Sequence, residues 1–572
     1  MSADGTDSAD QSVHFDHAAE AAGALDLLLS DAARGGLRRF APDAATAHLV
    51  LQLARRPLAV GRRGGWLAAE LGKVLAGRSQ LAANHRDRRF AEPAWRENPL
   101  LRRALQAYLA SGQAAGGLLD DADLSWRDNE RLQFLLLNLI AAAAPSNNPL
   151  MSPAAWKSFI DTGGRSAVRG VRALVSDMSA SPRVPTMVTP DAFTVGADLA
   201  VSPGAVISRS EVCEVIQYGP ATPKVRRYPV LIVPPTINKF YIADLAPGRS
   251  LIEFLIGQGL QVFTISWRNP DARHRHWNLD TYGRAIVDAL GTVRQICKAA
   301  KASICAFCSG GILTSMVSAH LSATGQADQL ASIYLGVTVL DQSHAGTAAA
   351  MISPRTAAAA AAASRSRGYL DGRMLAEVFA WLRPDDLVWR YWVNNYLQGK
   401  PPAAFDILYW NADTTRMPAA LHHDFLQLAI SNALTRAGAA TMLGSPVDLS
   451  KVDVDSYLMA GVADHLCAWQ SCYRSTQLLG GSSRFVLSTS GHIASIINPP
   501  TNPKSTFRTA AGNPDDPDEW QAQAMTAQGS WWPDYASWLT ARSGGLKQAR
   551  RSLGSAAYPP TEQAPGTYVL HR

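Results

Sequence analysis

The stretch Lys301–Met316, KASICAFCSGGILTSM, decides the fold. An apolar run with strand character ends at Cys308, and a pair of glycines then opens an amphipathic helix. The pattern G-x-S-x-G marks such a strand–nucleophile–helix corner, because small residues on both sides of the nucleophile let the backbone turn sharply. Here Ala306 and Gly310 fill the small positions, and Cys308 replaces the serine. The spacing predicts a nucleophilic thiol, with the backbone N–H of Ser309 as part of an oxyanion hole.

Two other interpretations of Cys308 stay open at this point. Free cysteine is among the most buried residue types, so Cys308 could be a small core residue. Cys305 and Cys308 also form a C-x-x-C, the spacing of a redox pair. A redox pair follows a strand and opens a helix, whereas Cys305 lies inside the apolar run. We therefore expect Cys305 to pack in the sheet.

The chain around this corner alternates between short β-branched segments and helical segments. We expect strands at Val230–Val233, Val262–Trp267, the run into Cys308, Ala331–Leu340, Ser456–Gly461 and Arg484–Thr489. Strands that alternate with helices of this length indicate a mostly parallel sheet covered on both faces. The predicted fold class is α/β, over residues 181–572.

Two other regions depart from this pattern. Residues 1–15 are polar and are expected to be disordered, and residues 16–180 show apolar positions at three- and four-residue spacing, which predicts a helical N-terminal domain. Residues 341–445 interrupt the sheet pattern with stretches rich in tryptophan and tyrosine. Aromatic residues at such spacing are most often ordinary core, but a long insertion between strands can also be a lid that excludes water from a site. We expect a lid or cap.

Composition limits the possible function classes. The 572 residues are 47% apolar with a dispersed net charge of +7, and no nucleic-acid motif is present. The apolar runs fall short of the roughly 20 residues that span a bilayer, so we expect no transmembrane segment. The acidic start MSADGTDSADQ lacks a signal-peptide pattern, and six cysteines in so long a chain fit reduced thiols. We expect a cytoplasmic protein.

A nucleophilic thiol needs a base and a residue that orients the base. In the fold that carries this corner, these follow the nucleophile in the order Asp or Glu, then His, each after a strand. Asp464 and His492 satisfy the order and the placement. His465 competes for the role of base, but adjacent residues point in different directions, so we assign it a supporting role. The cysteines Cys467 and Cys472 do not complete a zinc pattern, and we expect no metal.

Several motifs together resemble the polyhydroxyalkanoate synthases, the bacterial enzymes that polymerise 3-hydroxyacyl-CoA into polyester storage granules. They are DRRFAEPAWRENP (87–99), PSNNP (145–149), PPTINKFYIAD (234–244), ISWRNP (265–270), the Cys308 corner, ADHLCAW (463–469), GHIASIINPP (491–500) and GSWWP (529–533). The family's nucleophile falls on Cys308, its catalytic aspartate on Asp464 and its catalytic histidine on His492.

The resemblance implies an α/β-hydrolase fold with a lid or cap insertion and an acyltransferase of the long single-subunit type. It implies (R)-3-hydroxyacyl-CoA and a growing polyester chain as substrates, with coenzyme A as product rather than cofactor. A homodimer at the surface of a cytoplasmic granule would be the working form, and Ser309 with Ile237 would hold the oxyanion. Ala306 departs from the glycine usual in the family, and a methyl group there is tolerable if the backbone angles are ordinary.

Two alternatives to a polymerase stay open. A cysteine-type thioesterase or esterase would use the same three residues but admit water to the acyl-enzyme. A catalytically silent granule-coating protein would keep the fold without turnover. The preferred chain length of the monomer also stays open from the sequence.

Overall fold

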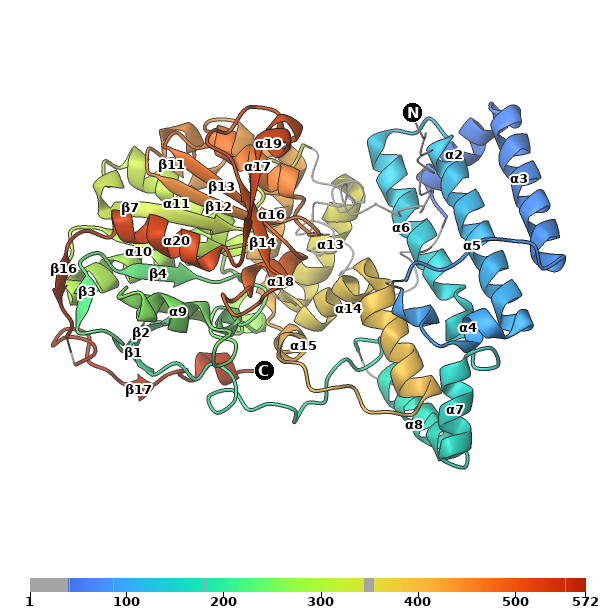
Figure 1. Cartoon of the computed structure of the whole chain (residues 1–572). Helices are drawn as coiled ribbons and strands as arrows, with labels where there is room; N and C mark the ends of the chain where they lie inside the picture. The colour runs from blue at the N-terminus through green and yellow to red at the C-terminus, as the bar shows by residue number, and fades with distance from the viewer. Residues whose placement is uncertain are drawn as a thin grey trace, which may run out of the picture.

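The computed structural model describes residue 40 and residues 42–85, 87–179, 181–343, 354–464, 466–550 and 552–572. Residues 1–15, for which we expect disorder, lie outside these ranges, and so does His465. Figure 1 shows a sheet covered by helices on both faces, with a group of N-terminal helices beside it. This arrangement confirms the predicted α/β class and the helical N-terminal region.

A single large sheet forms the centre of residues 181–572. Its order is β15-β14-β13-β12-β7-β6-β4-β5-β2-β1-β17. The six strands from β13 to β5 are mutually parallel, and the strands outside them pair antiparallel. The parallel strands are β4 (Val230–Val233), β5 (Val262–Trp267), β6 (Ala302–Phe307), β7 (Leu330–Gly336), β12 (Ser456–Gly461) and β13 (Ser483–Ser488).

The parallel strands are buried along their length because helices cover them. Every residue of β4, β5, β6 and β12 is buried, as expected of unbroken apolar runs in a parallel sheet. The covering helices are α9 (Leu251–Gly257), α10 (Leu279–Cys297), α11 (Ser309–Ala323), α17 (Trp469–Leu478) and α20 (Trp532–Arg542). Helix α11 is buried from Ser309 to Leu321 and lies at the centre of the domain.

The edge strands correct the expectation of a mostly parallel sheet. They are β1 (Gly204–Arg209), β2 (Cys213–Tyr218), β14 (Thr506–Thr509), β15 (Met525–Gln528) and β17 (Glu562–Gln563), and they make the sheet mixed. The strands β14, β15 and β17 have only two to four residues each, which is too short for a clear alternation of polar and apolar residues. The sequence pattern therefore did not predict them. Strand β7 also ends at Gly336, short of the predicted Leu340.

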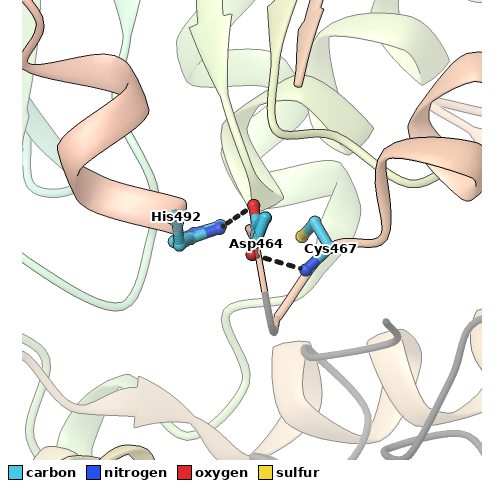
Figure 2. A group of neighbouring side chains, drawn as sticks. All are labelled: Asp464, Cys467 and His492. Atoms are coloured by element: carbon cyan, nitrogen blue, oxygen red, sulfur yellow. Dashed lines mark hydrogen bonds and ion pairs between the residues drawn. The ribbon is translucent and has the colours of Figure 1, made fainter. Parts of the chain in front are cut away.

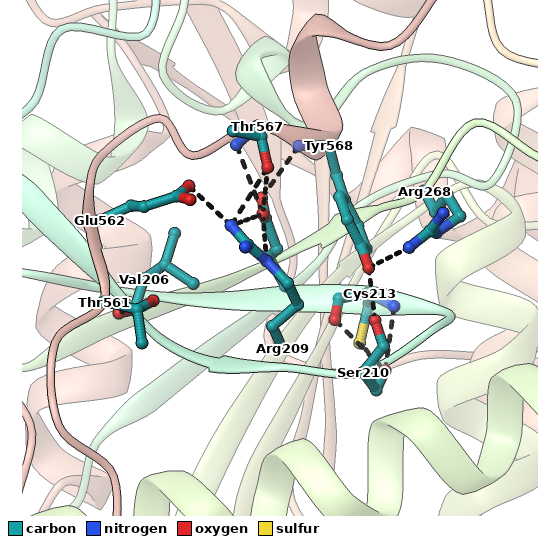
Figure 3. A network of polar contacts seen from close by, with 10 residues as sticks. Val206, Arg209, Ser210, Cys213, Arg268, Thr561, Glu562, Thr567 and Tyr568 are labelled. Atoms are coloured by element: carbon teal, nitrogen blue, oxygen red, sulfur yellow. Dashed lines mark hydrogen bonds and ion pairs between the residues drawn. The ribbon is translucent and has the colours of Figure 1, made fainter.

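The C-terminal segment is fixed to the sheet edge by a buried carboxylate. Glu214 on β2 is fully buried and accepts hydrogen bonds from Arg209, at 2.6 Å, and from the backbone N–H of Tyr568, at 3.1 Å. Arg209 also pairs with Glu562 on β17 at 2.6 Å (Figure 3). A buried charge is stable only when it is paired and hydrogen-bonded, so these contacts bring the last residues of the chain against β1 and β2.

Among the described residues of the insertion 341–445, several helices lie between the sheet and the N-terminal helices (Figure 1). The helices of this insertion are α13 (Pro354–Arg367), α14 (Gly372–Leu382), the π-helical segments η7 (Asp385–Trp389) and η8 (Trp392–Leu397), α15 (Asp406–Ala412) and α16 (Ala419–Ser431). The N-terminal helices are α2 (Ala44–Ala54), α3 (Pro57–Leu75), α4 (Ala94–Glu97), α5 (Pro99–Asp120), α6 (Trp126–Ala142), α7 (Pro153–Asp161) and α8 (Arg165–Ser179).

The N-terminal helices contact the insertion through specific polar bonds. Arg89 pairs with Asp385 of η7 at 2.6 Å. Tyr396 of η8 donates a hydrogen bond to Asp177 of α8 at 2.7 Å. At Gly170 a Cβ atom would stand 1.9 Å from the carbonyl oxygen of Tyr396, so the two backbones meet directly. The N-terminal helices therefore support the segment that lines the cavity described below.

Candidate active site

The corner at Cys308 has the backbone geometry that the motif predicts. Cys308 has φ 50° and ψ −122°, an unusual conformation for a residue with a side chain, and its N–H donates to the carbonyl oxygen of Gly336 at 2.9 Å. A Cβ at Gly310 would lie 2.6 Å from the carbonyl oxygens of Val233 and Pro234, so this position requires glycine. Ala306 has an ordinary backbone conformation inside β6 and is fully buried, so its methyl group is accommodated.

The structure brings the thiol, the imidazole and the carboxylate together from three strand ends. Cys308 follows β6, Asp464 follows β12, and His492 follows β13 and opens the short helix α18 (His492–Ile496). His492 Nδ1 lies 2.7 Å from Asp464 Oδ2, and both side chains are buried (Figure 2). Cys308 and His492 line the same cavity. His465 lies outside the described residues.

The carboxylate of Asp464 is itself held by the backbone. Its Oδ1 atom accepts the N–H groups of Leu466 and Cys467 at 2.8 and 2.9 Å, while Oδ2 faces His492. This Asx-type turn fixes the carboxylate orientation. An aspartate held in this way fixes the tautomer of the imidazole with Nδ1–H toward Asp464, leaving Nε2 for the thiol.

The charges of the three groups are coupled. Burial opposes protonation of His492, but the charge of Asp464 and its hydrogen bond outweigh burial and raise the pKa of His492 to about 10. The hydrogen bond with Cys467 and burial raise the pKa of Cys308 well above its ordinary value, whereas the contacts with His492 act to lower it. The carboxylate of Asp464 therefore stabilises the protonated form of the His492 imidazole, whereas burial favours the neutral thiol of Cys308.

The loop after β4 meets the start of α11 next to Cys308. Thr236 uses its N–H to donate to Ser309 Oγ at 2.9 Å. The N–H groups of Ser309, at the start of α11, and of Ile237 have no hydrogen-bond partner among the described residues. Because Ser309 Oγ also contacts the Thr236 hydroxyl at 3.1 Å, the buried serine side chain ties the loop after β4 to the helix.

A cavity opens above Cys308 and His492. Its volume is about 260 Å³, and its lining is mostly apolar. The sheet side contributes Ile237, Ile242 and Ile496, and the insertion contributes Leu387, Phe405 and Leu408. Arg383 and Asp386 are the charged residues of this lining. The insertion thus covers the thiol with apolar side chains.

The alternatives for the cysteines can now be compared with the structure. Cys305 is fully buried in β6, as expected, and burial raises its pKa to about 12. It therefore lacks the exposed, low-pKa thiol of a redox pair. Cys308 instead lines the cavity and is partly exposed.

The sequence did not assign a role to Cys467, which the structure places at the site. Potential ligand atoms of Asp464, Cys467 and His492 lie within 4.8 Å of one another. The Asp464 and His492 atoms are already joined by their mutual hydrogen bond (Figure 2). The short spacing between Asp464 and Cys467 in the sequence is a signal of this proximity that the sequence analysis did not use.

This corner, followed in chain order by the aspartate and the histidine, defines a protein of the α/β-hydrolase fold. Residues 229–499 match the alpha/beta hydrolase fold family, and residues 86–255 match the family described as Poly-beta-hydroxybutyrate polymerase (PhaC) N-terminus. Over 521 residues, the chain is 45% identical to poly(3-hydroxyalkanoate) polymerase 2 of Ectopseudomonas oleovorans, covering 91% of this chain and 93% of that protein. The chain belongs to the poly(3-hydroxyalkanoate) polymerases, which are acyltransferases.

Two further relatives agree with this assignment. Poly(3-hydroxyalkanoate) polymerase 1 of Ectopseudomonas oleovorans is 44% identical over 537 residues, which are 94% of this chain and 96% of that protein. The poly(3-hydroxyalkanoate) polymerase subunit PhaC of Cupriavidus necator is 38% identical over 504 residues, which are 86% of this chain and 84% of that protein. The described residues contain no helix long and apolar enough to cross a membrane.

Proposed function

We propose that this chain polymerises (R)-3-hydroxyacyl-CoA into polyester, releasing coenzyme A, through an acyl group carried on Cys308. The observation that carries the proposal is the hydrogen bond between His492 and Asp464, with Cys308 and His492 lining the same apolar cavity. Family membership supports the reaction, and the geometry supports the role of each residue.

In the acylation step, His492 takes the proton of Cys308 while the sulfur attacks the thioester carbonyl. Negative charge then develops on the carbonyl oxygen, and the free N–H groups of Ser309 and Ile237 stabilise it. The oxyanion collapses, the carbon–sulfur bond of the substrate breaks, and coenzyme A leaves with the proton from His492. Asp464 stabilises the imidazolium that forms in between.

In the transfer step, His492 deprotonates the 3-hydroxyl group of another acyl unit, which attacks the acyl-cysteine. Water would compete for the same carbonyl carbon and give a free hydroxy acid. The apolar lining contributed by Leu387, Phe405 and Leu408 supports exclusion of water, and we therefore assign the insertion the role of lid. His465 keeps its proposed supporting role beside Asp464.

The place of action follows from the chemistry of the product. We propose that the protein works as a homodimer on the surface of a cytoplasmic polyester granule. Exposed apolar side chains on α7 and α8 support contact with such a surface. On α8 these are Val168, Val171, Val175 and Met178, at a spacing that gives one side of a helix.

The test incubates the purified chain with (R)-3-hydroxybutyryl-CoA and, in parallel, with longer 3-hydroxyacyl-CoA thioesters. Release of coenzyme A together with insoluble polyester is the expected result. Coenzyme A with free hydroxy acid and no polymer would instead indicate a thioesterase. No turnover of any of these thioesters would favour a granule-coating protein.

A matched control separates thiol chemistry from folding. Cys308→Ala removes the sulfur, whereas Cys305→Ala removes a buried thiol from the same strand region. Polymer formation is expected to be lost in the Cys308 variant and retained in the Cys305 variant. Equal turnover by the Cys308 variant and the wild type would reject the proposed nucleophile.

A further inference from the structure

Lys239 is a buried charged group that the mechanism leaves unused. It lies in the loop after β4, two residues beyond Ile237, and only 3% of its surface is exposed. Its Nζ atom donates hydrogen bonds to the carbonyl oxygens of Val569, at 2.8 Å, and His571, at 2.5 Å. Burial lowers the pKa of Lys239 to about 8. Because a lysine is rarely buried without such partners, the two carbonyl contacts explain why this side chain is stable in the interior.

The two acceptors belong to a C-terminal segment, residues 567–571, which we call the tail. The N–H groups of Thr567 and Tyr568 donate to the buried carboxylate of Glu214 on β2. The hydroxyl of Tyr568 donates to the carbonyl oxygen of Ser210 at 2.7 Å (Figure 3). The tail is therefore fixed to the edge of the sheet at one end and contacts the loop after β4 at the other.

The insertion holds the same loop through backbone contacts. The carbonyl oxygen of Ile237 accepts the N–H of Thr415 at 3.0 Å. The carbonyl oxygen of Lys239 accepts the indole N–H of Trp410 at 2.8 Å. The loop thus lies between the insertion and the tail, and the side chain of Lys239 supplies a contact with the tail.

We propose that Lys239 is a positioning residue, which keeps the Ile237 N–H at the oxyanion position by tying its loop to the tail. Among the described residues, the lining of the cavity includes Ile237 and Asn238 but not Lys239, so the effect passes through the backbone. The inference rests on the proposed function, because the oxyanion role of the Ile237 N–H is part of it. The contact between the loop and the tail can be tested independently.

Lys239→Met removes the ammonium group and keeps an unbranched side chain that fills the space. The carbonyl oxygens of Val569 and His571 then lose a buried donor, which costs free energy, and the tail separates from the loop. A misplacement of about 1 Å at a reacting centre can cost 10²-fold in rate. We expect kcat for release of coenzyme A from (R)-3-hydroxybutyryl-CoA to fall by about 10- to 100-fold. The change in KM should be smaller, because the apolar cavity that binds the acyl group is unchanged.

Lys547 provides the matched control. Its Nζ atom also donates to a backbone carbonyl oxygen, that of Cys297, at 2.7 Å, and burial lowers its pKa. It lies on β16 (Leu546–Gln548), which pairs with β3 (Lys224–Arg226) in a separate two-stranded sheet. Lys547→Met should therefore leave kcat and KM unchanged. Equal losses of kcat in the Lys239 and Lys547 variants would overturn the proposal.

Deletion of His571 and Arg572 tests the other side of the contact. It removes one acceptor of Lys239 and keeps Val569, which is buried, in place. The deletion should lower kcat in the otherwise wild-type chain. It should cost less in the Lys239→Met background, because both changes break the same contact. Equal losses in the two backgrounds would show that Lys239 and the tail act independently, which contradicts the proposal.

Hydrogen–deuterium exchange of the full chain gives a second measurement that needs no turnover. Lys239→Met should speed exchange in residues 236–244 and 567–571 and leave β4 and β6 unchanged, whereas Lys547→Met should change neither segment. Wild-type exchange in residues 236–244 of the Lys239 variant, or faster exchange throughout the sheet, would overturn the proposal. The expected exchange pattern in a protein that turns over no thioester would keep the contact between Lys239 and the tail and reject the proposed function.

Discussion

His492 Nδ1 lies 2.7 Å from Asp464 Oδ2, although 28 positions separate the two residues in the chain. The contact arises because β12 and β13 are adjacent and parallel, so their carboxyl ends meet at one edge of the sheet. The same edge carries Cys308 at the end of β6. The parallel order of these strands is what turns three distant residues into one site.

Asp464→Asn should keep the fold and lose most of the activity. The amide oxygen can still accept the N–H groups of Leu466 and Cys467, but it can no longer stabilise an imidazolium at His492. We expect kcat to fall by roughly 10³- to 10⁴-fold, measured as release of coenzyme A. An unchanged kcat with an intact fold would show that His492 does not depend on this carboxylate.

The stability of the fold should depend on pH through His492. Its pKa rises from an ordinary 6.5 to about 10 in the folded chain, so the folded state holds this proton more tightly than the unfolded state. The resulting stabilisation is complete below pH 6.5 and is lost as pH rises through about 10. Urea unfolding across this range should show a steeper fall in the free energy of unfolding for the wild type than for His492→Gln. Parallel curves for the two proteins would contradict the assigned cause.

Ser309→Ala should slow the reaction without removing any reacting group. The buried hydroxyl holds Thr236 next to the start of α11, and its loss should let the Ile237 N–H drift from the oxyanion position. We expect kcat to fall by about 10- to 100-fold with a smaller change in KM. Ser315→Ala is the control, because Ser315 is equally buried in α11 but donates to the Gly311 carbonyl oxygen within the helix. Equal losses in both variants would indicate general helix damage.

Gly170→Ala should weaken the contact between α8 and the insertion. The added methyl group would stand 1.9 Å from the carbonyl oxygen of Tyr396, and such overpacking costs about 1–3 kcal/mol. Gly116→Ala in α5 is the control: its Cβ meets nothing within 4 Å, and alanine in a helix interior is favoured over glycine by about 0.5–1 kcal/mol. Chemical unfolding should show opposite signs for the two variants. A destabilised Gly116 variant or an unaffected Gly170 variant would show that this contact is not formed as described.

The sequence predicted the parts of the site that follow from periodicity and order. Unbroken apolar runs located β4, β6 and β12, and the corner motif located Cys308. Since parallel strands end on one side, the order of cysteine, aspartate and histidine was sufficient to predict that they meet. Because Ser309 directly follows Cys308, the corner motif also placed Ser309 at the start of the helix.

Other features depend on contacts that no local pattern encodes. Strand β17 has two residues and is held by Arg209 and Glu214 rather than by its own alternation. The contact of Tyr396 with α8 joins segments more than 200 residues apart. The place of Cys467 depends on the turn around Asp464, because a shift of one residue would point the thiol elsewhere. Such features can be identified only from the folded structure.

Trapping the acyl-enzyme shows whether the growing acyl chain is carried on the sulfur of Cys308. The full chain is mixed with (R)-3-hydroxybutyryl-CoA, quenched in acid within the first turnover and digested, and the peptide 302–355 is fragmented in a mass spectrometer. We expect the mass of one or more hydroxybutyryl units on Cys308, and none in Cys308→Ala. Polymer formation with the acyl mass on another residue, or with Cys308 unmodified, would rule out Cys308 as the carrier.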